Sequence, residues 1–375
     1  MKNKVVVAGH ISIDITPNFA DGPATDINSL FKPGGLTIVD DAVISLGGCV
    51  SNTGLALDFF GDDVTIMSTI ADDTFGKITT DEINKTSANA KLHVREEGSS
   101  AYTFVISPPG IDRMFFHNPG VNSETTNEDL DFEIIKQSKV FHFGYPTIMK
   151  KYLENDCAEL IDLFKKVKSE LGVVTSLDLS MPMDIELTNS IDWYEVFDRL
   201  LPYVDIFCPS FEEVLILTDY EKYKDLTKLS TSGDIMDSIS LEEDIKPIAR
   251  LLNRYGAPVV LLKCGSHGMY LKTASADNFK NLSKNCGVDI NQWADVDYFQ
   301  KSFKADKVLS ATGAGDTSIG AFLHAIMLGY SAKDSVKYAA ATGASCVTAH
   351  DSISGLLTFE QISQKLDKGW PYNED

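Results

Sequence analysis

A single carboxylate on a glycine-rich hinge is the feature of this sequence that most clearly points to chemistry. The run Gly313–Asp316 (GAGD) precedes apolar residues that recur at helical spacing from Ile319 to Ile326. The first N–H groups of a helix lack intrahelical partners and form an anion site, and glycine lets a ligand approach the backbone closely. The helix dipole is expected to hold Asp316 ionised. Transfer of a phosphoryl group to a hydroxyl fits both features, because the amides would stabilise the phosphoryl charge while the acid deprotonates the hydroxyl.

Common nucleotide-binding motifs do not explain this run. No Gly-Lys-[Ser/Thr] follows the glycines, so the run is not a Walker loop. The dinucleotide fingerprint G-x-G-x-x-G is absent here and after the first predicted strand. An acid near a helix start is also a frequent capping residue, and this structural interpretation of Asp316 stays open at this point.

Short apolar runs alternate with longer helical patterns, and these elements must position the hinge. Most of the runs are continuously apolar, as is typical of strands covered on both faces. They are Lys4–Ala8, Val64–Thr69, Lys139–Phe143, Val173–Asp178, Val204–Cys208 and Val259–Lys263. Met149–Leu171 carries an apolar helical stripe, and Gly172 is placed to end that helix. We therefore expect an α/β fold, with a doubly wound, mostly parallel sheet flanked by helices.

Two segments without a helical partner predict a small second sheet. Ile11–Leu46 ends in a β-like run, and Ala101–Asn118 predicts two strands joined by a Pro-Pro-Gly-Ile-Asp turn. We expect these discontinuous segments, about residues 11–46 and 101–118, to form a lid on a single domain spanning residues 1–375. The polar, weakly periodic stretches Tyr220–Asp244 and Thr273–Asp306 are expected to be surface insertions.

Composition excludes several classes of function. The formal net charge is −21 and no long basic stripe occurs, so neither nucleic acid nor an anionic membrane surface is an expected partner. No run approaches the ~20 apolar residues of a membrane span, and the start of the chain lacks a signal-peptide pattern. The six cysteines form no C-x-x-C pair and are expected to be buried, reduced thiols. A cytoplasmic location is the resulting expectation.

Several motifs, in order along the chain, resemble those of the ribokinase-type (PfkB) carbohydrate kinases. The GAGD run resembles the end of the family signature D-T-x-G-A-G-D, although Ser310 and Ala311 stand where the family has Asp and Thr. A second signature is matched by GGCVSN at residues 47–52, and the first strand, VVVAGHISID, ends at Asp14. IDRMFFHNPGVN at residues 111–122 resembles an Arg-then-Pro-Gly-Ala-Asn stretch. SLDLSMP, VDIFCPSFEEV and VVLLKCGSHGMYL then follow in the family order, so the resemblance spans nearly the whole chain.

The resemblance implies a ribokinase-like fold and a role for each hinge residue. Asp316 would be the catalytic base, and Gly313, Ala314 and Gly315 would supply the anion hole. Asp178, which closes a predicted strand, would touch the phosphate or metal region. The roles of Asp316 and of the three residues before it agree with the chemistry inferred above from the hinge itself.

On the acceptor side, the resemblance implies five substrate-binding residues. Asp14 would accept hydrogen bonds from sugar hydroxyls, and the Asn52 amide would donate to and accept from them. Gly47 and Gly48 would let the substrate lie against the backbone, and Arg113 would reach it from the lid. Each role has a structural alternative. Asp14 would only close a strand, and Asn52 would be a polar helix residue. Gly47 and Gly48 would form a tight turn, and Arg113 would be an exposed hairpin arginine.

On the nucleotide side, the family uses an Asn-x-x-Glu motif to organise magnesium and phosphates. Here Glu213 takes the glutamate position and would act on the metal through water, whereas Ser210 replaces the asparagine. An acidic first helical turn is the alternative interpretation. Lys263 or the Gly265 backbone would meet the ATP phosphates, although a lysine at a solvated strand end is equally compatible. The small residues of Ala340–Ala349 resemble the helix near the adenine, and ordinary core packing explains them as well.

The favoured function is an ATP-dependent kinase for a free sugar or related polyol, with Mg²⁺ on the phosphates. A nucleoside kinase on the same fold is an alternative, in which Phe31, Phe115 or Phe116 would stack on a base. A phosphorylated sugar would need more cationic groups near the lid than Arg113. A non-catalytic binding protein is a further alternative, kept open by the substitutions in the signatures. The resemblance also implies a monovalent cation such as K⁺ and a homodimer through the lid.

Overall fold

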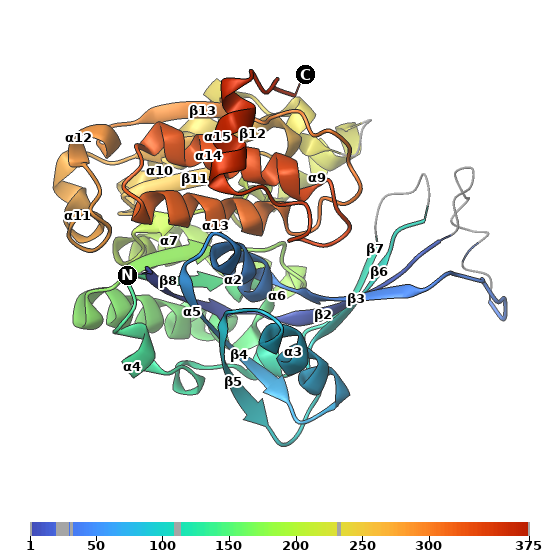
Figure 1. Ribbon diagram of the computed structural model, residues 1–375. Coiled ribbons are helices and arrows are strands. Elements are labelled where there is room, and N and C mark those ends of the chain that lie inside the picture. Colours follow the sequence, from blue (N-terminus) through green and yellow to red (C-terminus); the bar gives the residue numbers. More distant parts are fainter. Residues whose placement is uncertain (1, 20–29, 31–32, 109–113, 231–233, 374–375) are drawn as a thin grey trace.

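Two β-sheets organise the chain, for which the computed structural model describes residues 2–19, 30, 33–108, 114–230 and 234–373. Among these residues, nine strands form the larger sheet and four form the smaller sheet. In spatial order the larger sheet contains β13 (Asp297–Lys301), β12 (Gly268–Thr273), β11 (Val259–Lys263), β10 (Ile206–Phe207), β9 (Val174–Asp178), β8 (Val140–Gly144), β1 (Lys4–Gly9), β4 (Asp63–Ala71) and β5 (Asn89–Arg95). Figure 1 shows this sheet in the body of the molecule, with helices on both faces.

Pairing is parallel from β11 through β5, and the antiparallel pairs among these described strands are β11–β12 and β12–β13. Strand β1 lies between β4 and β8, with Val5 opposite Val64 on one side and Val140 on the other. The expected mostly parallel sheet is confirmed, and the carboxyl ends of its parallel strands meet at one edge. Ligands of open α/β sheets bind at that edge.

Helices cover both faces of the larger sheet, which explains why its strands are continuously apolar. Val5 and Val7 point into one hydrophobic cluster, whereas Val6 and Ala8 point into the other. The helices are α2 (Cys49–Phe59), α3 (Thr74–Asn84), α4 (Phe132–Ile135), α5 (Lys150–Lys165), α6 (Ile185–Asn189), α7 (Trp193–Leu200), α8 (Phe211–Thr218), α9 (Tyr220–Leu229), α10 (Lys246–Arg254), α11 (Lys280–Cys286), α12 (Ile290–Trp293), α13 (Ala314–Met327), α14 (Ala332–Cys346) and α15 (Phe359–Asp367). No helix of the described residues is long and apolar enough to cross a membrane.

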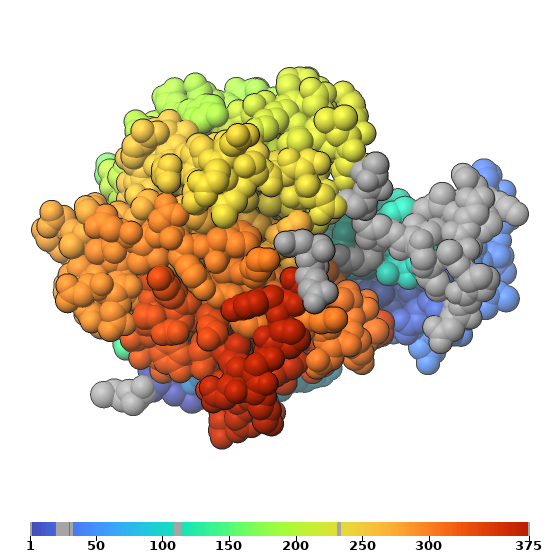
Figure 2. All heavy atoms as spheres, turned by 90° about the horizontal axis from the view of Figure 1, so that it is seen from above, coloured from blue at the N-terminus to red at the C-terminus, as the bar shows by residue number. Residues whose placement is uncertain are grey.

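The smaller sheet arises from the two segments that the sequence predicted. Its spatial order is β3 (Ala42–Gly47), β2 (Ser12–Pro17), β6 (Tyr102–Ile106) and β7 (Met114–Asn118). Strands β6 and β7 pair antiparallel as expected, although residues 109–113 of the predicted turn lie outside the described residues. The smaller sheet extends from one side of the body (Figures 1 and 2). The division of the chain into domains stays a prediction.

Two expectations about local structure need correction. Residues 273–306 do not form a surface insertion, because Phe279, Leu282 and Trp293 are buried in the core and β13 extends the larger sheet. In the sequence, polar residues separate these apolar side chains, so the segment shows no regular apolar pattern. In residues 220–244, α9 has no buried residue, as expected of a surface segment, but Ile235 and Met236 are buried.

The long helix predicted over Met149–Leu171 is less regular than its apolar stripe suggested. Helix α5 contains a kink at residues 154–157, and a π-type turn over Lys166–Leu171 follows it. The predicted end is confirmed, because Gly172 has φ 70° and adopts the left-handed conformation that favours glycine. All six cysteines are buried and free, as the sequence indicated.

Candidate active site

The glycine-rich hinge delivers Asp316 into the interior at the start of α13. Gly313 precedes the helix with φ 74°, a left-handed conformation that most side chains resist. A Cβ atom at this position would lie 2.5 Å from Ser352 Cβ, so the site also lacks space for a side chain. Asp316 lies in the first turn and is only 3% exposed. The hinge therefore places a buried carboxyl group beside the N-terminal amides of a 14-residue helix.

Three side chains from distant parts of the chain surround Asp316. Asn52, in the first turn of α2, donates from Nδ2 to Asp316 Oδ2 over 2.9 Å. The Tyr145 hydroxyl lies 2.8 Å from Oδ1 and 3.0 Å from Oδ2 of Asp316. Thr53 Oγ1 donates to the Asp316 carbonyl oxygen over 3.2 Å. The carboxylate is thus held in one orientation by donors from α2 and from the end of β8.

Burial raises the pKa of Asp316 above its ordinary value, and the positive charge of Lys263 and the donors Asn52 and Tyr145 oppose that rise. The expectation that the helix dipole holds Asp316 ionised stays a prediction. Desolvation is the larger effect because the carboxyl group lies in the interior. A raised pKa suits a group that must accept a proton.

A buried ion pair lies on the other side of the hinge. Lys263 Nζ, at the end of β11, lies 2.6 Å from Asp178 Oδ1, at the end of β9. Asp178 is fully buried, and its Oδ2 atom has no hydrogen-bond partner. Burial lowers the pKa of Lys263, but the charges of Asp178, Glu213 and Asp316 outweigh burial and raise it above its ordinary value. The interpretation of Lys263 as a solvated strand end is therefore wrong.

Ser210 and Glu213 form a capping box at the start of α8. The Ser210 hydroxyl accepts a 3.0 Å hydrogen bond from the Glu213 N–H, and Glu213 Oε2 accepts a 2.7 Å hydrogen bond from the Ser210 N–H. Burial raises the pKa of Glu213, and Lys263 and Ser210 oppose the rise. The acidic first turn thus has a structural role, and it also brings Glu213 electrostatically close to Lys263.

Two cavities lie on opposite sides of the hinge and share Ala311 in their linings. The smaller cavity, of about 420 Å³, is lined by Thr312, Gly313 and Asp316. The larger cavity, of about 590 Å³, is lined by Ala314, Gly315 and Ser318. The hinge therefore forms part of the wall between the two spaces.

The expected acceptor-binding residues gather around the smaller cavity. Asp14, Gly48 and Asn52 line it directly. Gly47 lies behind them, where a Cβ atom would overlap the Asp14 carboxylate. Burial raises the pKa of Asp14, and hydrogen bonds from Thr103 and Ser12 oppose the rise. Arg113 and Phe31 lie outside the described residues, so their predicted roles stay predictions.

Of the four expected nucleotide-side residues, Lys263 and Gly265 line the larger cavity, whereas Ser210 and Glu213 line neither cavity. The stem of Lys263 packs beside Gly315. Four members of the predicted adenine segment in and after α14 also line the larger cavity: Ala340, Gly343, Ala344 and Val347. Two separate sets of predicted residues thus meet at two separate cavities.

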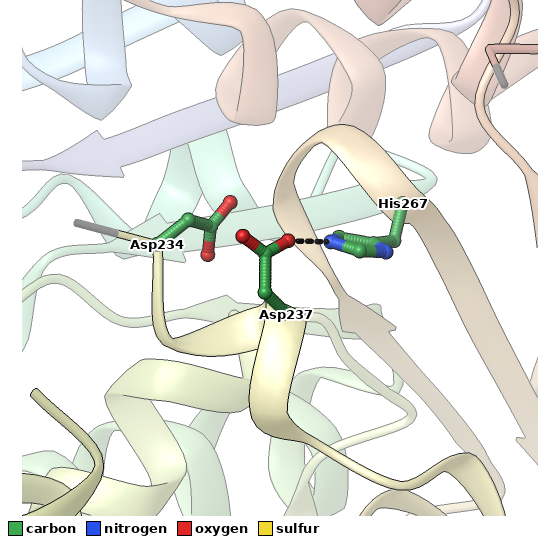
Figure 3. Close-up of side chains that lie close together, drawn as sticks. All are labelled: Asp234, Asp237 and His267. Atoms are coloured by element: carbon green, nitrogen blue, oxygen red, sulfur yellow. Dashed lines mark hydrogen bonds and ion pairs between the residues drawn. The ribbon is translucent and has the colours of Figure 1, made fainter. Parts of the chain in front are cut away.

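A cluster of possible metal ligands occurs at the larger cavity. Asp234, Asp237 and His267 each offer one ligand atom, and these atoms lie within 4.8 Å of one another (Figure 3). His267 Nε2 lies 3.0 Å from Asp237 Oδ1, and Asp234 lines the larger cavity. Exposed acidic groups of this kind are common without a metal ion, so the cluster by itself assigns no function.

Sequence reasoning missed Tyr145, His10 and His117. Tyr145 directly follows β8 and adopts φ 66°, an uncommon value for a residue other than glycine. His10 directly follows β1, and His117 lies in β7 of the smaller sheet. The signal that could have found Tyr145 and His10 is their position at the carboxyl ends of adjacent parallel strands.

Comparison with known proteins agrees with this geometry. A family model described as pfkB family carbohydrate kinase matches residues 2–358. Among curated relatives, fructokinase-2 of Oryza sativa subsp. japonica is 22% identical over 382 residues, covering 98% of this chain and 94% of the relative. The 5-dehydro-2-deoxygluconokinase of Clostridium beijerinckii is 22% identical over 365 residues, covering 96% of this chain and 92% of the relative.

Solved structures share the fold over nearly the whole length. The Arabidopsis thaliana ribokinase complexed with ribose and ATP has a TM-score of 0.66 and 19% identity, covering 98% of this chain and 99% of that one. A ribokinase-like protein from E. coli in complex with ATP and Mg²⁺ has a TM-score of 0.69 and 20% identity, with the same coverage. The expected ribokinase-like fold is confirmed.

The chain belongs to the pfkB family of carbohydrate kinases. This confirms the class of enzyme that the hinge and the ordered motifs predicted, an ATP-dependent sugar kinase. The comparisons do not favour the alternatives of a nucleoside kinase or a non-catalytic binding protein.

Proposed function

We propose that this chain transfers the γ-phosphoryl group of ATP to a hydroxyl group of a free sugar or related polyol, with Asp316 as the catalytic base. The observation that carries the proposal is the hinge between the two cavities. An acceptor in the smaller cavity and a nucleotide in the larger one would meet across Gly313–Gly315. This arrangement suits an in-line displacement, in which the attacking and leaving oxygens lie on opposite sides of the phosphorus.

In this mechanism Asp316 takes the proton of the attacking hydroxyl. The acceptor oxygen forms a bond to the γ-phosphorus while the bond from that phosphorus to the ADP oxygen breaks. The N–H groups of Gly313, Ala314 and Gly315, at the start of α13, would stabilise the charge on the transferred group. The Ala314 N–H donates to the Ala311 carbonyl over 3.3 Å, and it would exchange that bond for one to the phosphoryl oxygen. Asn52 and Tyr145 hold the Asp316 carboxylate toward the acceptor.

Lys263 is suited to the ATP phosphates. Its ammonium is drawn toward Asp178, and its stem runs beside Gly315, next to the proposed anion hole. Since Lys263 also lines the larger cavity, it can neutralise phosphate charge without entering the acceptor site. Gly265, with φ 53° at the next turn, would let the phosphates approach the backbone.

The donor set fits a Mg²⁺ ion accompanying ATP. The Lys263 ammonium pairs with Asp178, the charges of Glu213 and Asp316 also act on it, and Asp178 Oδ2 has no partner. Carboxylate oxygens are ligands that Mg²⁺ prefers, and Glu213 with Asp178 would hold the ion directly or through water. When bound, Mg²⁺ would neutralise charge on the phosphates. A monovalent cation such as K⁺ is also part of the proposal, and comparing activity in K⁺ and in Na⁺ tests it.

The smaller sheet would act as a lid that excludes water from the acceptor cavity. Its residues Ser12, Thr103 and His117 line that cavity. Apolar side chains on the same sheet are exposed, with Ile44 at 49% and Phe116 at 55%. We therefore include a homodimer through this sheet in the proposal, since an exposed apolar patch is typical of an interaction surface. Light scattering of the purified protein gives the oligomeric state.

The test is ADP release from Mg-ATP in the presence of a panel of acceptors. The panel contains fructose, ribose, other free sugars and polyols, sugar acids, sugar phosphates and nucleosides. We expect one free sugar or polyol to be strongly preferred. Turnover of a nucleoside alone, or of no acceptor, would contradict the proposed function.

The Asp316→Asn variant provides the matched test of mechanism. The loss of a general base typically lowers the rate by about 10²–10⁴-fold, and we expect kcat to fall by a factor in this range. ATP affinity, measured by calorimetry, should change little because Asp316 lines the acceptor cavity. Near-normal turnover by this variant would contradict the assignment of Asp316 as the base.

A further inference from the structure

Two histidines face each other across the boundary between the body and the smaller sheet. His10 follows β1, and His117 lies in β7, yet their ring centroids are 4.9 Å apart with the rings at 61°. Both residues line the smaller cavity, together with Ser12, Asp14 and Thr103. The pair therefore belongs to the acceptor side of the hinge, and none of the steps described above uses it.

Hydrogen bonds within the protein leave three ring nitrogens of this pair without partners. The backbone of His10 is fully engaged, because its N–H donates to the Gly144 carbonyl and its carbonyl accepts from the Val50 N–H. His10 is only 1% exposed, but neither of its ring nitrogens has a hydrogen-bond partner. His117 Nδ1 lies 2.9 Å from Thr103 Oγ1, whereas its Nε2 has no partner. Buried polar atoms are normally paired, so three unpaired nitrogens at a cavity point to a ligand that supplies the partners.

The charges around the cavity limit what that ligand can be. Burial and the neighbouring His117 lower the pKa of His10 to about 3, and burial also lowers the pKa of His117. Both imidazoles are therefore neutral near pH 7, and each has one donor and one acceptor nitrogen. The ionisable acids in the lining are Asp14 and Asp316, and the described lining residues include no lysine or arginine. Among the described lining residues, a carboxylate or phosphate on the acceptor would face Asp14 and Asp316 and no cationic side chain. The predicted contact of Arg113 with the acceptor lies outside the described residues.

We propose that His10 and His117 recognise the acceptor by hydrogen bonds to its hydroxyl groups, and that this pair selects a neutral sugar or polyol over sugar acids and sugar phosphates. A hydroxyl group both donates and accepts, so it complements a neutral imidazole, whereas a carboxylate only accepts. Phe115, Ile148, Met181 and Met183 add apolar surface to the lining, which also disfavours a charged group. The inference rests on the proposed function and specifies its acceptor.

The first experiment measures KM for the preferred acceptor and for ATP in His117→Ala, His117→Gln and His10→Asn variants. The loss of a hydrogen bond to a hydroxyl should raise the acceptor KM by up to about tenfold. The ATP KM should stay within about twofold, because neither histidine lines the larger cavity. Glutamine retains a donor and an acceptor, so His117→Gln should recover part of the loss. His93→Gln, in β5 and outside the cavity, is the control and should change neither constant.

The second experiment compares acceptors in the wild-type enzyme and in His117→Arg. We expect kcat/KM for the neutral sugar to exceed that for the corresponding sugar acid by about 100-fold in the wild type, because like charges facing each other are strongly disfavoured. A cation at residue 117 should lower this ratio by about tenfold.

Three results would overturn the inference. One is an unchanged acceptor KM in a folded His117→Ala variant; this residue is only partly buried, so its truncation should leave the fold intact even if His10→Asn unfolds. The second is a wild-type preference for a sugar acid or sugar phosphate. In both cases kinase activity stands while the role of the histidines fails. If the wild type phosphorylates no acceptor, the proposed function fails and the inference fails with it.

Discussion

Asn52 Nδ2 donates a 2.9 Å hydrogen bond to Asp316 Oδ2, joining two residues that are 264 positions apart in the chain. The bond connects the first turns of α2 and α13, whose N-termini both open at the smaller cavity. Gly320 lies against Ala56 farther along, which lets the two helices pack closely. The position of the proposed base is therefore set by the packing of two helices as much as by its own hinge.

Replacing Tyr145 with phenylalanine should shift the pH dependence of catalysis. The Tyr145 hydroxyl helps hold down the pKa of Asp316, which burial has already raised. A base must be ionised to act, so activity is lost as the pH falls through its pKa. Without this donor the pKa should rise further, and the acidic limb of kcat/KM should move to higher pH. Tyr152→Phe, at a buried tyrosine whose hydroxyl bonds Asn127, is the control. Superimposable profiles of Tyr145→Phe and wild type would contradict this account.

The Lys263 and Asp178 pair should respond unequally to single and double substitution. Removal of one partner of a buried ion pair typically costs about 3–5 kcal/mol, because the other charge stays buried without compensation. We expect Lys263→Met to lower the free energy of unfolding by about this amount in urea titrations. Combining it with Asp178→Asn should recover part of the stability, because one buried carboxylate is then neutral. Equal midpoints for Lys263→Met and the double variant would show that the two groups are not coupled.

Acid should destabilise the protein through its buried histidines. Burial, and to a smaller extent repulsion from the positive charge of Lys263, lowers the pKa of His142 to about 3. In the unfolded chain this group titrates near an ordinary value of about 6.5. Below that pH the unfolded state binds a proton that the folded state does not, so stability present at neutral pH is lost on acidification. The expected contribution is about 1.4 kcal/mol per pH unit between roughly pH 6 and pH 4.

The His142→Asn variant isolates that contribution. Its free energy of unfolding should fall less steeply than that of the wild type as the pH is lowered from 7 to 4, although its stability at pH 7 is itself lower after the loss of the Ser176 contact. Urea denaturation at each pH measures both curves. Parallel curves would mean that His142 does not change its protonation on unfolding.

Substitution of Gly313 by alanine should impair both folding and catalysis. The left-handed φ of 74° costs a residue with a Cβ atom about 1–2 kcal/mol, and the new atom would press on Ser352. The hinge would then shift and move Asp316 relative to Asn52, so kcat should fall together with the melting temperature. Adding Ser352→Gly removes the contact but leaves the backbone cost. If the double variant regained full stability and activity, steric contact and not backbone conformation would be the reason for this glycine.

Local patterns were sufficient to predict much of the architecture. Continuous apolar runs predicted the central parallel strands, because both faces of such a sheet are covered. The segments around residues 11–46 and 101–118 predicted the smaller sheet, because strand-like runs without intervening helices must pair with one another. Gly313 and Asp316 identified the hinge, because a glycine requirement and a helix start are both local properties of the chain.

Only the folded chain decided which of the predicted groups meet and in what charge state. Asp178 and Lys263 lie 85 positions apart, and nothing in either local sequence indicates that they form a buried pair. His10, His117 and Tyr145 come together because strand order brings the ends of β1 and β8 beside a sheet built from other segments. The rise in the pKa of Asp316 follows from burial, a property of the whole packed interior. Chemistry at this site therefore depends on long-range packing, whereas the elements that carry it depend on local sequence.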